Sequence, residues 1–533
     1  MSSFYVPSNS KIAFSNKRKE IKKNQELKQN LEKTAFPQTL QTYLGQKGYT
    51  VLKQELTLDQ IEILKELLTA RPFLLGTITT KTFPIYREST KKIYMPRWFG
   101  EEYFGPPKSI EISDGDNINI TFKGTLREHQ IPAVGAYLGS VQGSQYNGGL
   151  LELSCAAGKT VMSLYIISKL SKKTLIIVNK EFLLNQWVER IQEFLPDAKI
   201  GRIQGPIIDI EDKDIVIGML QSLSMKDYPQ STFQSFGLTI VDEVHHISSE
   251  VFSCALFKIV TKYTLGISAT MERKDGTTNI IKMFLGDVLY KNISNDSHDV
   301  LVRAIEYRTK DDEFEETEYD FRGQPKYSTM ISKLCNYQPR SDFIVKVVCD
   351  LIQENPRNQI MILGHNRSLL VYLHDAIQAK NIVSIGYYLG GMKQAELQKT
   401  EGKQIVVATY SMAAEALDIK TLSTLVMVTP KTDIVQSVGR ILRTKHTNPI
   451  IVDIVDMHGL FQNQWNKRRV FYKKCDYHIQ ITDSNKYKDM KTMSSDIWKL
   501  VHNPKHTICN GKQEEHKCLV NMDAFGPILV SGI

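Results

Sequence analysis

Short runs of β-branched residues alternate with helical apolar patterns over most of this 533-residue chain. Four runs in the first half are LIIV (175–178), DIVIG (214–218), LTIVD (238–242) and YTLGIS (263–268). Strands that alternate with helices of this length are typical of parallel sheets with crossover connections. The pattern therefore predicts an α/β fold and excludes an all-helical or all-β chain.

A second series follows with QIMILG (359–364), QIVVAT (404–409), TLVMVT (424–429) and PIIVDIVD (449–456). The acidic stretch 311–320 lies between the two series and is most simply explained as a solvated linker or surface loop. Two blocks of similar size predict two similar α/β domains that face one cleft. Ligands of such sheets bind beyond the carboxyl ends of the strands.

The segment before the first block has a different texture. Thr57 and Gln60 have the spacing of a capping box ahead of a helix. Residues 82–107 interleave basic and aromatic side chains, which either bind nucleic acid or, the favoured alternative, form the core of a small β-rich domain. We expect a basic flexible arm (1–35), an N-terminal accessory domain (36–118), a first α/β domain (119–292), a linker or insert (293–340), a second α/β domain (341–478) and a C-terminal extension (479–533).

Composition narrows the setting of the protein. No apolar run is long enough for a membrane span, and seven scattered cysteines indicate reduced thiols in the cytosol or nucleus. The net charge of +9 suits a polyanionic partner. Residues 11–33 carry eight basic residues against three glutamates, so this arm either solubilises the chain or tethers nucleic acid.

The stretch LLELSCAAGKT (150–160) predicts a strand, a tight turn and the start of a buried helix. Backbone N–H groups of Cys155, Ala156, Ala157 and Gly158 would face a phosphate at the helix N-terminus. Lys159 would contact the β- and γ-phosphates, and the Thr160 hydroxyl would face Mg²⁺. Leu153 stands where G-x-x-x-x-G-K-[ST] has its first glycine, so a strand–helix turn with a chance GKT is the alternative.

An apolar strand that ends in IVDEVHH (240–246) predicts the rest of a magnesium–ATP site. Asp242 would hold Mg²⁺ through its water ligands, and Glu243 would polarise the attacking water. Zinc bound by these acids with His245, His246 and Glu250 is disfavoured because the H-E-x-x-H spacing is absent.

Two further elements complete the pattern. Ser268 and Thr270 end the strand expected beside the DEVH strand. In QSVGRILR (436–443), Arg440 and Arg443 share one helical face and would neutralise a transferring γ-phosphoryl group from the second domain. Surface arginines on an amphipathic helix are the alternative.

These four elements, in this order across two α/β blocks, resemble those of superfamily 2 helicases. The resemblance covers about residues 120–475 and implies two tandem RecA-like parallel-sheet motor domains, with a small N-terminal α+β domain and a short C-terminal extension. SCAAGKT resembles the P-C-G-A-G-K-[ST] loop of XPB-type helicases, and SATMERKDG (268–276) their S/T-A-T-x-x-R-E-D element. This branch includes phage UvsW and the transcript-release helicases of poxviruses and other large cytoplasmic DNA viruses, and the viral group is the most similar.

The resemblance implies further site residues, each by its place in a motif. They are Arg127 and Gln130 near the adenine, Ser154 beside the phosphate loop, Asp418 and Gln436 on the nucleotide, His245, Ser268 and Thr270 in coupling, and Arg273 and Thr409 on nucleic acid. Four positions depart from the family pattern. They are Ala156 for a loop glycine, Lys274 for glutamate, Ala416 for glycine and Ser437 for a basic residue.

We therefore expect a monomeric motor that uses ATP and Mg²⁺, with ATP bound between its two α/β domains. DNA is favoured over RNA as its partner, in viral transcription, replication or repair, with the transcription machinery as a further partner and no membrane. The expected place is the cytoplasm or nucleus, and for a viral protein the cytoplasmic factory and the virion. The alternatives are an RNA helicase, a translocase that releases transcripts without strand separation, and a non-catalytic scaffold.

The C-terminal part is less informative. Lys467, Arg468, Arg469, Lys473 and Lys474 form a basic cluster that is most simply a solvated face, with nucleic-acid binding as the alternative. Cys509, His516 and Cys518 with His502 and His506 match no standard zinc spacing, so a zinc site there is disfavoured.

Overall fold

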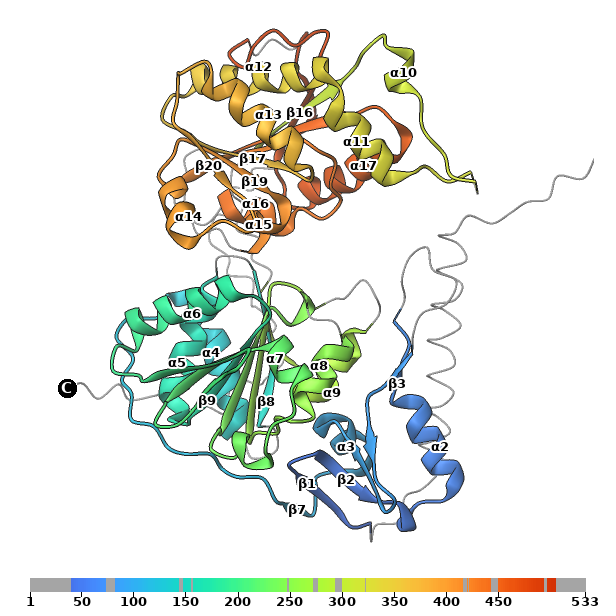
Figure 1. Cartoon of the computed structure of the whole chain (residues 1–533), viewed down its shortest axis with the longest axis vertical. Helices are drawn as coiled ribbons and strands as arrows, with labels where there is room; N and C mark the ends of the chain where they lie inside the picture. Colours follow the sequence, from blue (N-terminus) through green and yellow to red (C-terminus); the bar gives the residue numbers. More distant parts are fainter. Residues whose placement is uncertain are drawn as a thin grey trace, which may run out of the picture. The chain divides into compact units, whose positions relative to one another are not determined.

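The computed structural model describes residues 40–72, 82–142, 147–154, 157–246, 249–271, 277–292, 300–321, 323–415, 419, 421–441, 449–492 and 496–504. The chain divides into two compact units, the first ending at Ile293 and the second beginning at Ser294 (Figure 1). No helix among the described residues is long and apolar enough to cross a membrane.

The first unit opens with a five-stranded sheet in the order β5-β6-β2-β1-β7. Its elements are β1 (Thr42–Gly45), β2 (Gly48–Leu52), α2 (Leu58–Leu67), β5 (Arg87–Glu88), β6 (Lys92–Met95), α3 (Arg97–Phe104) and β7 (Ser109–Ile110), and the short strands β3 (Thr69–Ala70) and β4 (Phe83–Pro84) pair separately. The predicted capping box starts α2, because Thr57 and Gln60 exchange side-chain and backbone hydrogen bonds. Tyr49, Ile93 and Phe99 belong to the core of this small sheet, so several aromatic residues of this segment are structural.

An eight-stranded sheet follows in the order β11-β10-β12-β9-β13-β14-β8-β15, parallel except for the β10–β11 pair. Its strands are β8 (Gly148–Leu153), β9 (Thr174–Val178), β10 (Ile200–Gln204), β11 (Ile207–Asp209), β12 (Ile215–Met219), β13 (Leu238–Asp242), β14 (Tyr263–Ser268) and β15 (Val288–Asn292). Its helices are α4 (Ile131–Gln142), α5 (Lys159–Leu170), α6 (Glu181–Phe194), α7 (Leu220–Met225), α8 (Ser249–Leu256) and α9 (Thr278–Leu285).

This sheet has an apolar core on each face. Ile176 packs in the cluster with α4, α5 and α6, whereas its neighbour Ile177 packs in the cluster with α7, α8 and α9. The two groups of helices lie on opposite faces of the sheet (Figure 1). Strands buried on both faces explain why these segments are apolar throughout instead of alternating with polar residues.

The second unit has its own eight-stranded sheet, in the order β18-β19-β17-β20-β21-β16-β22-β23. Its strands are β16 (Leu301–Tyr307), β17 (Gln359–Gly364), β18 (Ile385–Tyr388), β19 (Ile405–Thr409), β20 (Leu422–Met427), β21 (Ile450–Asp456), β22 (His478–Asp483) and β23 (Lys499–His502). Its helices are α10 (Asp312–Glu315), α11 (Tyr327–Asn336), α12 (Gln338–Glu354), α13 (Arg367–Gln378), α14 (Gln394–Glu401), α15 (Tyr410–Glu415), α16 (Val435–Ile441) and α17 (Gly459–Lys474).

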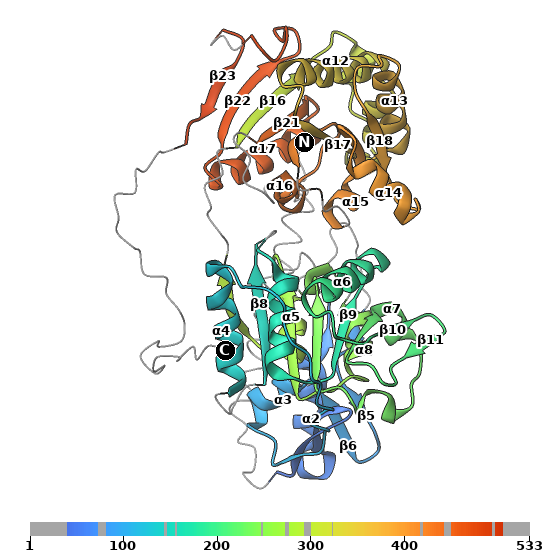
Figure 2. The same ribbon diagram turned by 90° about the vertical axis from the view of Figure 1, so that its left-hand side faces the viewer.

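The second sheet is wider than the sequence pattern indicates. β16 lies in the segment expected to be a linker, yet it pairs with β21 on one side and β22 on the other. β22 and β23, from the expected C-terminal extension, continue the same sheet (Figure 2). The expected edges of the second domain therefore differ from those of its sheet, because strands added by long-range pairing carry no local signal of the partner they pair with.

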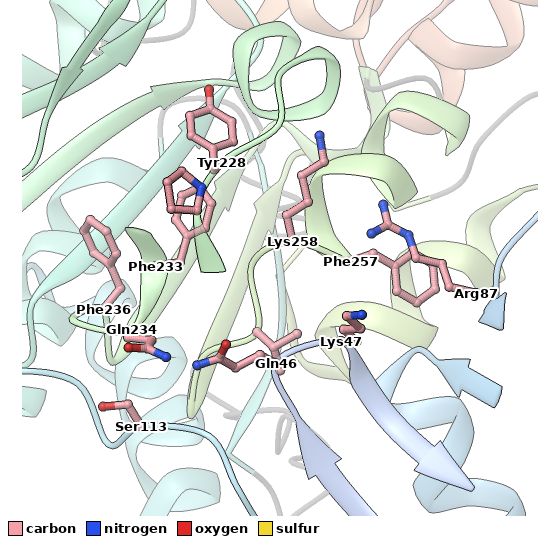
Figure 3. Close-up of a pocket in the computed structure, with 12 residues that line it drawn as sticks. Gln46, Lys47, Arg87, Ser113, Tyr228, Phe233, Gln234, Phe236, Phe257 and Lys258 are labelled. Carbon is pink, nitrogen blue, oxygen red and sulfur yellow. The ribbon is translucent and has the colours of Figure 1, made fainter. Parts of the chain in front are cut away.

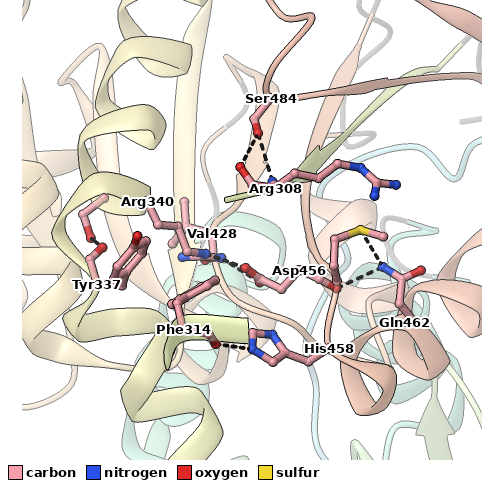
Figure 4. A network of polar contacts seen from close by, with 11 residues as sticks. Arg308, Phe314, Tyr337, Arg340, Val428, Asp456, His458, Gln462 and Ser484 are labelled. Carbon is pink, nitrogen blue, oxygen red and sulfur yellow. Dashed lines mark hydrogen bonds and ion pairs between the residues drawn. The ribbon is translucent and has the colours of Figure 1, made fainter. Parts of the chain in front are cut away.

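The acidic stretch 311–320 is not simply a solvated loop, which corrects the expectation. It contains α10, capped by the Asp311 side chain, and its Phe314 is buried. Phe314 stacks on Tyr337 with ring centroids 4.2 Å apart, and its carbonyl oxygen accepts a 2.7 Å hydrogen bond from His458 Nε2 (Figure 4). Phe314, an apolar residue within the acidic run, thus packs the segment against the rest of the second unit.

The basic cluster on α17 is also corrected in part. Arg468 is only 2% exposed, and its guanidinium donates two hydrogen bonds, of 2.7 and 2.9 Å, to the Asp453 carboxylate. Arg340 is fully buried on α12 and makes the same two-point contact with Asp456, at 2.6 and 2.8 Å. Arg468 therefore stabilises the fold and is not part of a solvated face.

Candidate functional site

The predicted phosphate loop lies between β8 and α5, at the carboxyl edge of the first sheet. Gly158 immediately precedes α5 in a left-handed conformation, with φ of 81°. The positive φ favours glycine, and a Cβ atom there would also lie 2.3 Å from Gln130 Nε2 and displace that side chain. Lys159 and Thr160 form the first turn of the helix, whose free N–H groups suit an anion. Cys155 and Ala156 lie outside the described residues.

The DEVH segment begins at the carboxyl end of β13, which is separated from β8 by one strand, β14, in the same sheet. Asp242 is the last residue of β13 and is 6% exposed, and Glu243 turns the chain with φ of 48°. Lys159 Nζ lies 2.7 Å from Glu243 Oε1, although the two residues are 84 positions apart. This ion pair brings the GKT turn and the DEVH strand end into one site.

Asp242 has an unusual environment for a carboxylate. Burial raises its pKa to about 6, and the negative charge of Glu243 adds to the rise, whereas Lys159 and the indole of Trp187 oppose it. A nearby divalent cation would favour the ionised form of such a group. Oxygen ligands from one carboxylate, with phosphates and water, are the donor set that Mg²⁺ prefers, so Asp242 fits this ion.

Trp187 is a member of the site that sequence reasoning missed. Its indole Nε1 donates a 2.9 Å hydrogen bond to Asp242 Oδ2. The residue is 1% exposed and shares a buried face of α6 with Leu183, Leu184 and Ile191. A tryptophan on an otherwise aliphatic helix face is the signal that could have revealed it, because most buried indole N–H groups donate to an acceptor.

Gln130, which the resemblance puts near the adenine, lies beside the phosphate loop in the structure. Its Nε2 donates a 2.9 Å hydrogen bond to the carbonyl oxygen of Ala157, and its Oε1 accepts one of 2.9 Å from the backbone N–H of Arg127. The side chain is 3% exposed. Gln130 therefore links the segment at 127 to the turn before α5.

His245, Ser268 and Thr270 form a chain of contacts across two strands. Ser268 Oγ donates a 2.7 Å hydrogen bond to the carbonyl oxygen of Thr270, so it accepts its second bond from His245 Nδ1. The same nitrogen lies 3.4 Å from Glu243 Oε2. β13 and β14 are direct neighbours, as expected, and this brings the two motifs together.

The predicted residues of the second unit are described only in part. Thr409 ends β19, where its hydroxyl lies 3.2 Å from that of Ser411. Gln436 and Arg440 belong to α16, but their side chains lie outside the described residues, as do Asp418 and Arg443. Arg273 of the first unit lies outside the described residues too.

The zinc alternatives receive no support from the part of the chain that the structure describes. Within it, no group of three or more His, Cys, Asp or Glu side chains is arranged to hold a metal ion. The His246 side chain and the C-terminal set from His506 to Cys518 lie outside that part.

Comparison with known proteins places these features in a family. A sequence profile described as "Type III restriction enzyme, res subunit" matches residues 123–273. "Putative ATP-dependent RNA helicase L396" of Acanthamoeba polyphaga mimivirus is 33% identical over 466 residues, which cover 84% of this chain and 89% of the relative. "DNA 3'-5' translocase XPB2" of Sulfurisphaera tokodaii is 33% identical over 189 residues, covering 34% of this chain and 40% of the relative.

The crystal structure of UvsW from phage T4 covers 80% of this chain and 96% of its own, with 16% identity and a TM-score of 0.31. The mimivirus relative matches this chain over most of both lengths. The chain belongs to the superfamily 2 helicases, in their XPB-like branch.

Proposed function

We propose that this protein is a magnesium-dependent ATPase that moves along nucleic acid, and that DNA is its substrate. The observation that carries the proposal is the 2.7 Å pair between Lys159 and Glu243, because it joins the phosphate loop to the acidic strand end at one edge of the sheet. That edge is where parallel sheets bind nucleotides.

Each residue of the site has a proposed role. Lys159 contacts the β- and γ-phosphates, Asp242 and Thr160 face the magnesium ion, and Glu243 orients and polarises the attacking water. Mg²⁺, when bound with ATP, neutralises charge on the phosphates. In the absence of phosphate, the Lys159 ammonium neutralises Glu243, so nucleotide binding would release that carboxylate for work on water.

Other residues bind, couple or complete the site in this proposal. Gln130 with Arg127 recognises the adenine, and the His245–Ser268–Thr270 chain transmits the state of Glu243 to the end of β14. The remaining proposed members are Ser154 and residues 155–158 at the phosphates, Asp418 and Gln436 at the nucleotide, Arg440 and Arg443 at the transferring phosphoryl group, and Arg273 and Thr409 at nucleic acid.

The names of the relatives cover both nucleic acids, since one is called an RNA helicase and another a DNA translocase. The DNA translocase name, within the same branch, favours DNA for this chain. The mimivirus relative favours a viral protein. We propose that this protein acts as a monomer in the cytoplasmic factory, with the transcription machinery as a further partner. An RNA helicase and a translocase that releases transcripts without separating strands are the alternatives.

The test measures steady-state ATP hydrolysis with no nucleic acid, with single-stranded DNA and with RNA, beside single-turnover unwinding of tailed duplexes. We expect DNA to stimulate hydrolysis more than RNA, and Lys159→Ala to abolish both activities. Hydrolysis that no nucleic acid stimulates would overturn the motor. Stimulation without unwinding would identify the releasing translocase instead.

A further inference from the structure

A pocket of about 180 Å³ lies where the small N-terminal sheet meets the first large sheet. Gln46 and Lys47 of the β1–β2 turn and Arg87 of β5 line it from one side. Residues 228–236, ahead of β13, and Phe257 to Val260, ahead of β14, line it from the other. It therefore lies at the amino ends of these strands. The five-residue strand β13 separates it from Asp242 by about 16 Å at roughly 3.3 Å per residue.

Aromatic rings form much of the pocket wall, as Figure 3 shows for Tyr228, Phe233, Phe236 and Phe257. Tyr228 and Phe233 meet edge to face, with centroids 5.3 Å apart. Phe233, Phe236 and Phe257 are buried and close the cavity, whereas Tyr228 is partly exposed. Drug-sized ligands fill about 300 Å³ or more, so this pocket suits a single ring with the rest of its molecule outside.

The charges at the rim are all positive. None of the described residues that line the pocket is acidic, whereas Lys47, Arg87 and Lys258 are basic. Lys258 Nζ is committed to the carbonyl oxygens of Leu223, Ser224 and Lys226 at 3.2, 2.8 and 2.6 Å. The Arg87 guanidinium lies 5.2 Å from the Phe257 ring centroid and donates a long hydrogen bond of 3.5 Å to the carbonyl oxygen of Cys254. Lys47 Nζ lies 5.4 Å from the Tyr94 ring centroid. Neither cation has an acidic partner among the described residues, so both can meet an anion.

Amide groups supply hydrogen bonding inside the pocket. Gln46 Oε1 is buried and has no hydrogen-bond partner among the described residues. Figure 3 shows the side-chain amides of Gln46 and Gln234 pointing toward one another across the pocket. A buried acceptor without a donor is costly, so this atom indicates a ligand that brings an N–H or O–H group.

We propose that this pocket receives one base of a single-stranded nucleic acid, with the base edge on Gln46 and the adjoining phosphate on Arg87 and Lys47. A strand presents rings one at a time beside phosphates, and aromatic walls with a basic rim are how proteins hold such strands without reading sequence. A phenylalanine of a partner peptide would leave Gln46 Oε1 unsatisfied. The inference rests on the proposed function and adds a second contact, at the edge of the sheet opposite the ATP site.

The test measures binding of the full-length protein to fluorescein-labelled oligothymidylate by anisotropy, over a range of salt concentrations. Arg87→Gln should weaken binding about fivefold and reduce the slope of log K against log salt by about 0.7, as the loss of one single-strand phosphate contact predicts. Lys91→Gln is the matched control, since Lys91 is an exposed cation of the same small domain outside the pocket. It should change affinity less than about twofold, with the slope kept.

Gln46→Met tests the base itself. It removes the acceptor at similar volume, so it should reduce the preference for oligothymidylate over an abasic strand of equal length and leave the salt slope unchanged. Competition by thymidine monophosphate, which lacks adenine and a β-phosphate, asks whether a free nucleotide can replace the strand. If thymidine monophosphate displaces the oligonucleotide from the wild type but not from Arg87→Gln, the pocket binds a free nucleotide, and the proposal of a strand is overturned.

The two proposals fail in different ways. A wild-type protein that binds no oligonucleotide would overturn the proposed function itself. A wild-type protein that binds, with Arg87→Gln and Gln46→Met both behaving like Lys91→Gln, would overturn the pocket alone. A peptide pocket would give this second outcome.

Discussion

Both large sheets bury carboxylates on their strands, but they hold them by different means. In the first sheet, Asp242 accepts a hydrogen bond from the neutral indole of Trp187, while the nearby Lys159 ammonium pairs with Glu243. In the second sheet, Asp456 and Asp453 each accept two hydrogen bonds from a buried arginine.

This difference in hydrogen-bond partner distinguishes a carboxylate of the proposed active site from carboxylates that stabilise the fold. A carboxylate held at two points by a guanidinium is charge-neutralised and fixed in orientation, so it is committed to the fold. A buried carboxylate whose side-chain partner is a neutral donor can gain by meeting a cation. Burial raises the pKa of Asp453 as well as that of Asp242, so the partner and not the pKa distinguishes them. Four variants, from the largest expected effect to the smallest, test this comparison.

Lys159→Ala should have the largest effect. Removing the ammonium leaves the transferring phosphates without their charged partner in the proposed site, and we expect kcat for ATP hydrolysis to fall by about 10³-fold, or about 4 kcal/mol. Lys169→Ala, at the other end of α5, is the control that should keep wild-type hydrolysis. If Lys159→Ala kept wild-type hydrolysis, the site at Lys159 and Asp242 in the first sheet would not be the ATP site.

Arg340→Met should cost stability instead of nucleotide chemistry. It leaves Asp456 buried without its guanidinium, which destabilises by about 3 kcal/mol or more. The denaturant midpoint of the second unit measures this loss. The double variant Arg340→Met/Asp456→Leu should recover much of it, because no buried charge then lacks a partner. A single variant as stable as wild type would show that the pair is not structural.

Trp187→Phe should have an intermediate effect. It keeps the ring and removes one hydrogen bond to a charged acceptor, worth about 1.5 kcal/mol. Mg²⁺ should lower the Kd of a fluorescent ATP analogue in both proteins, and we expect the factor by which it does so to be about tenfold smaller in this variant than in wild type. The control is Trp498→Phe, because the buried indole N–H of Trp498 has no hydrogen-bond partner in the part of the chain that the structure describes. If Mg²⁺ affected binding of the analogue equally in the two variants, Trp187 would not position Asp242.

Tyr472→Phe should have the smallest effect. The Tyr472 hydroxyl donates a 3.2 Å hydrogen bond to Asp453, which Arg468 already holds at two points. We expect a loss of about 0.5 to 1 kcal/mol in the free energy of unfolding, with nucleotide binding unchanged. A loss as large as that in Arg340→Met would mean that the phenol, and not the guanidinium, holds this carboxylate.

Local patterns in the sequence predicted much of the fold. The apolar runs at 175–178, 238–242 and 263–268 correspond to β9, β13 and β14, because a strand buried on both faces must be apolar at successive positions. The expected adjacency of the DEVH and SAT strands is also confirmed, since β13 pairs with β14. The strand–turn–helix at GKT follows from an apolar run, a glycine and a helical period that lie side by side in the chain.

Tertiary structure alone decided the contacts between distant segments. Trp187 meets Asp242 across 55 positions and Arg340 meets Asp456 across 116, and no local pattern records either partner. β16 belongs to the second sheet although its residues were expected to form a linker. Arg468 is buried because it pairs with the buried Asp453. The pocket at Gln46 and Arg87 likewise exists only where the small sheet packs on the large one. Sequence by itself determined the elements and the type of chemistry they carry, because periodicity and turn residues act over a few positions. Which side chains meet was decided by packing, because burial selects partners by their distance in space and not along the chain.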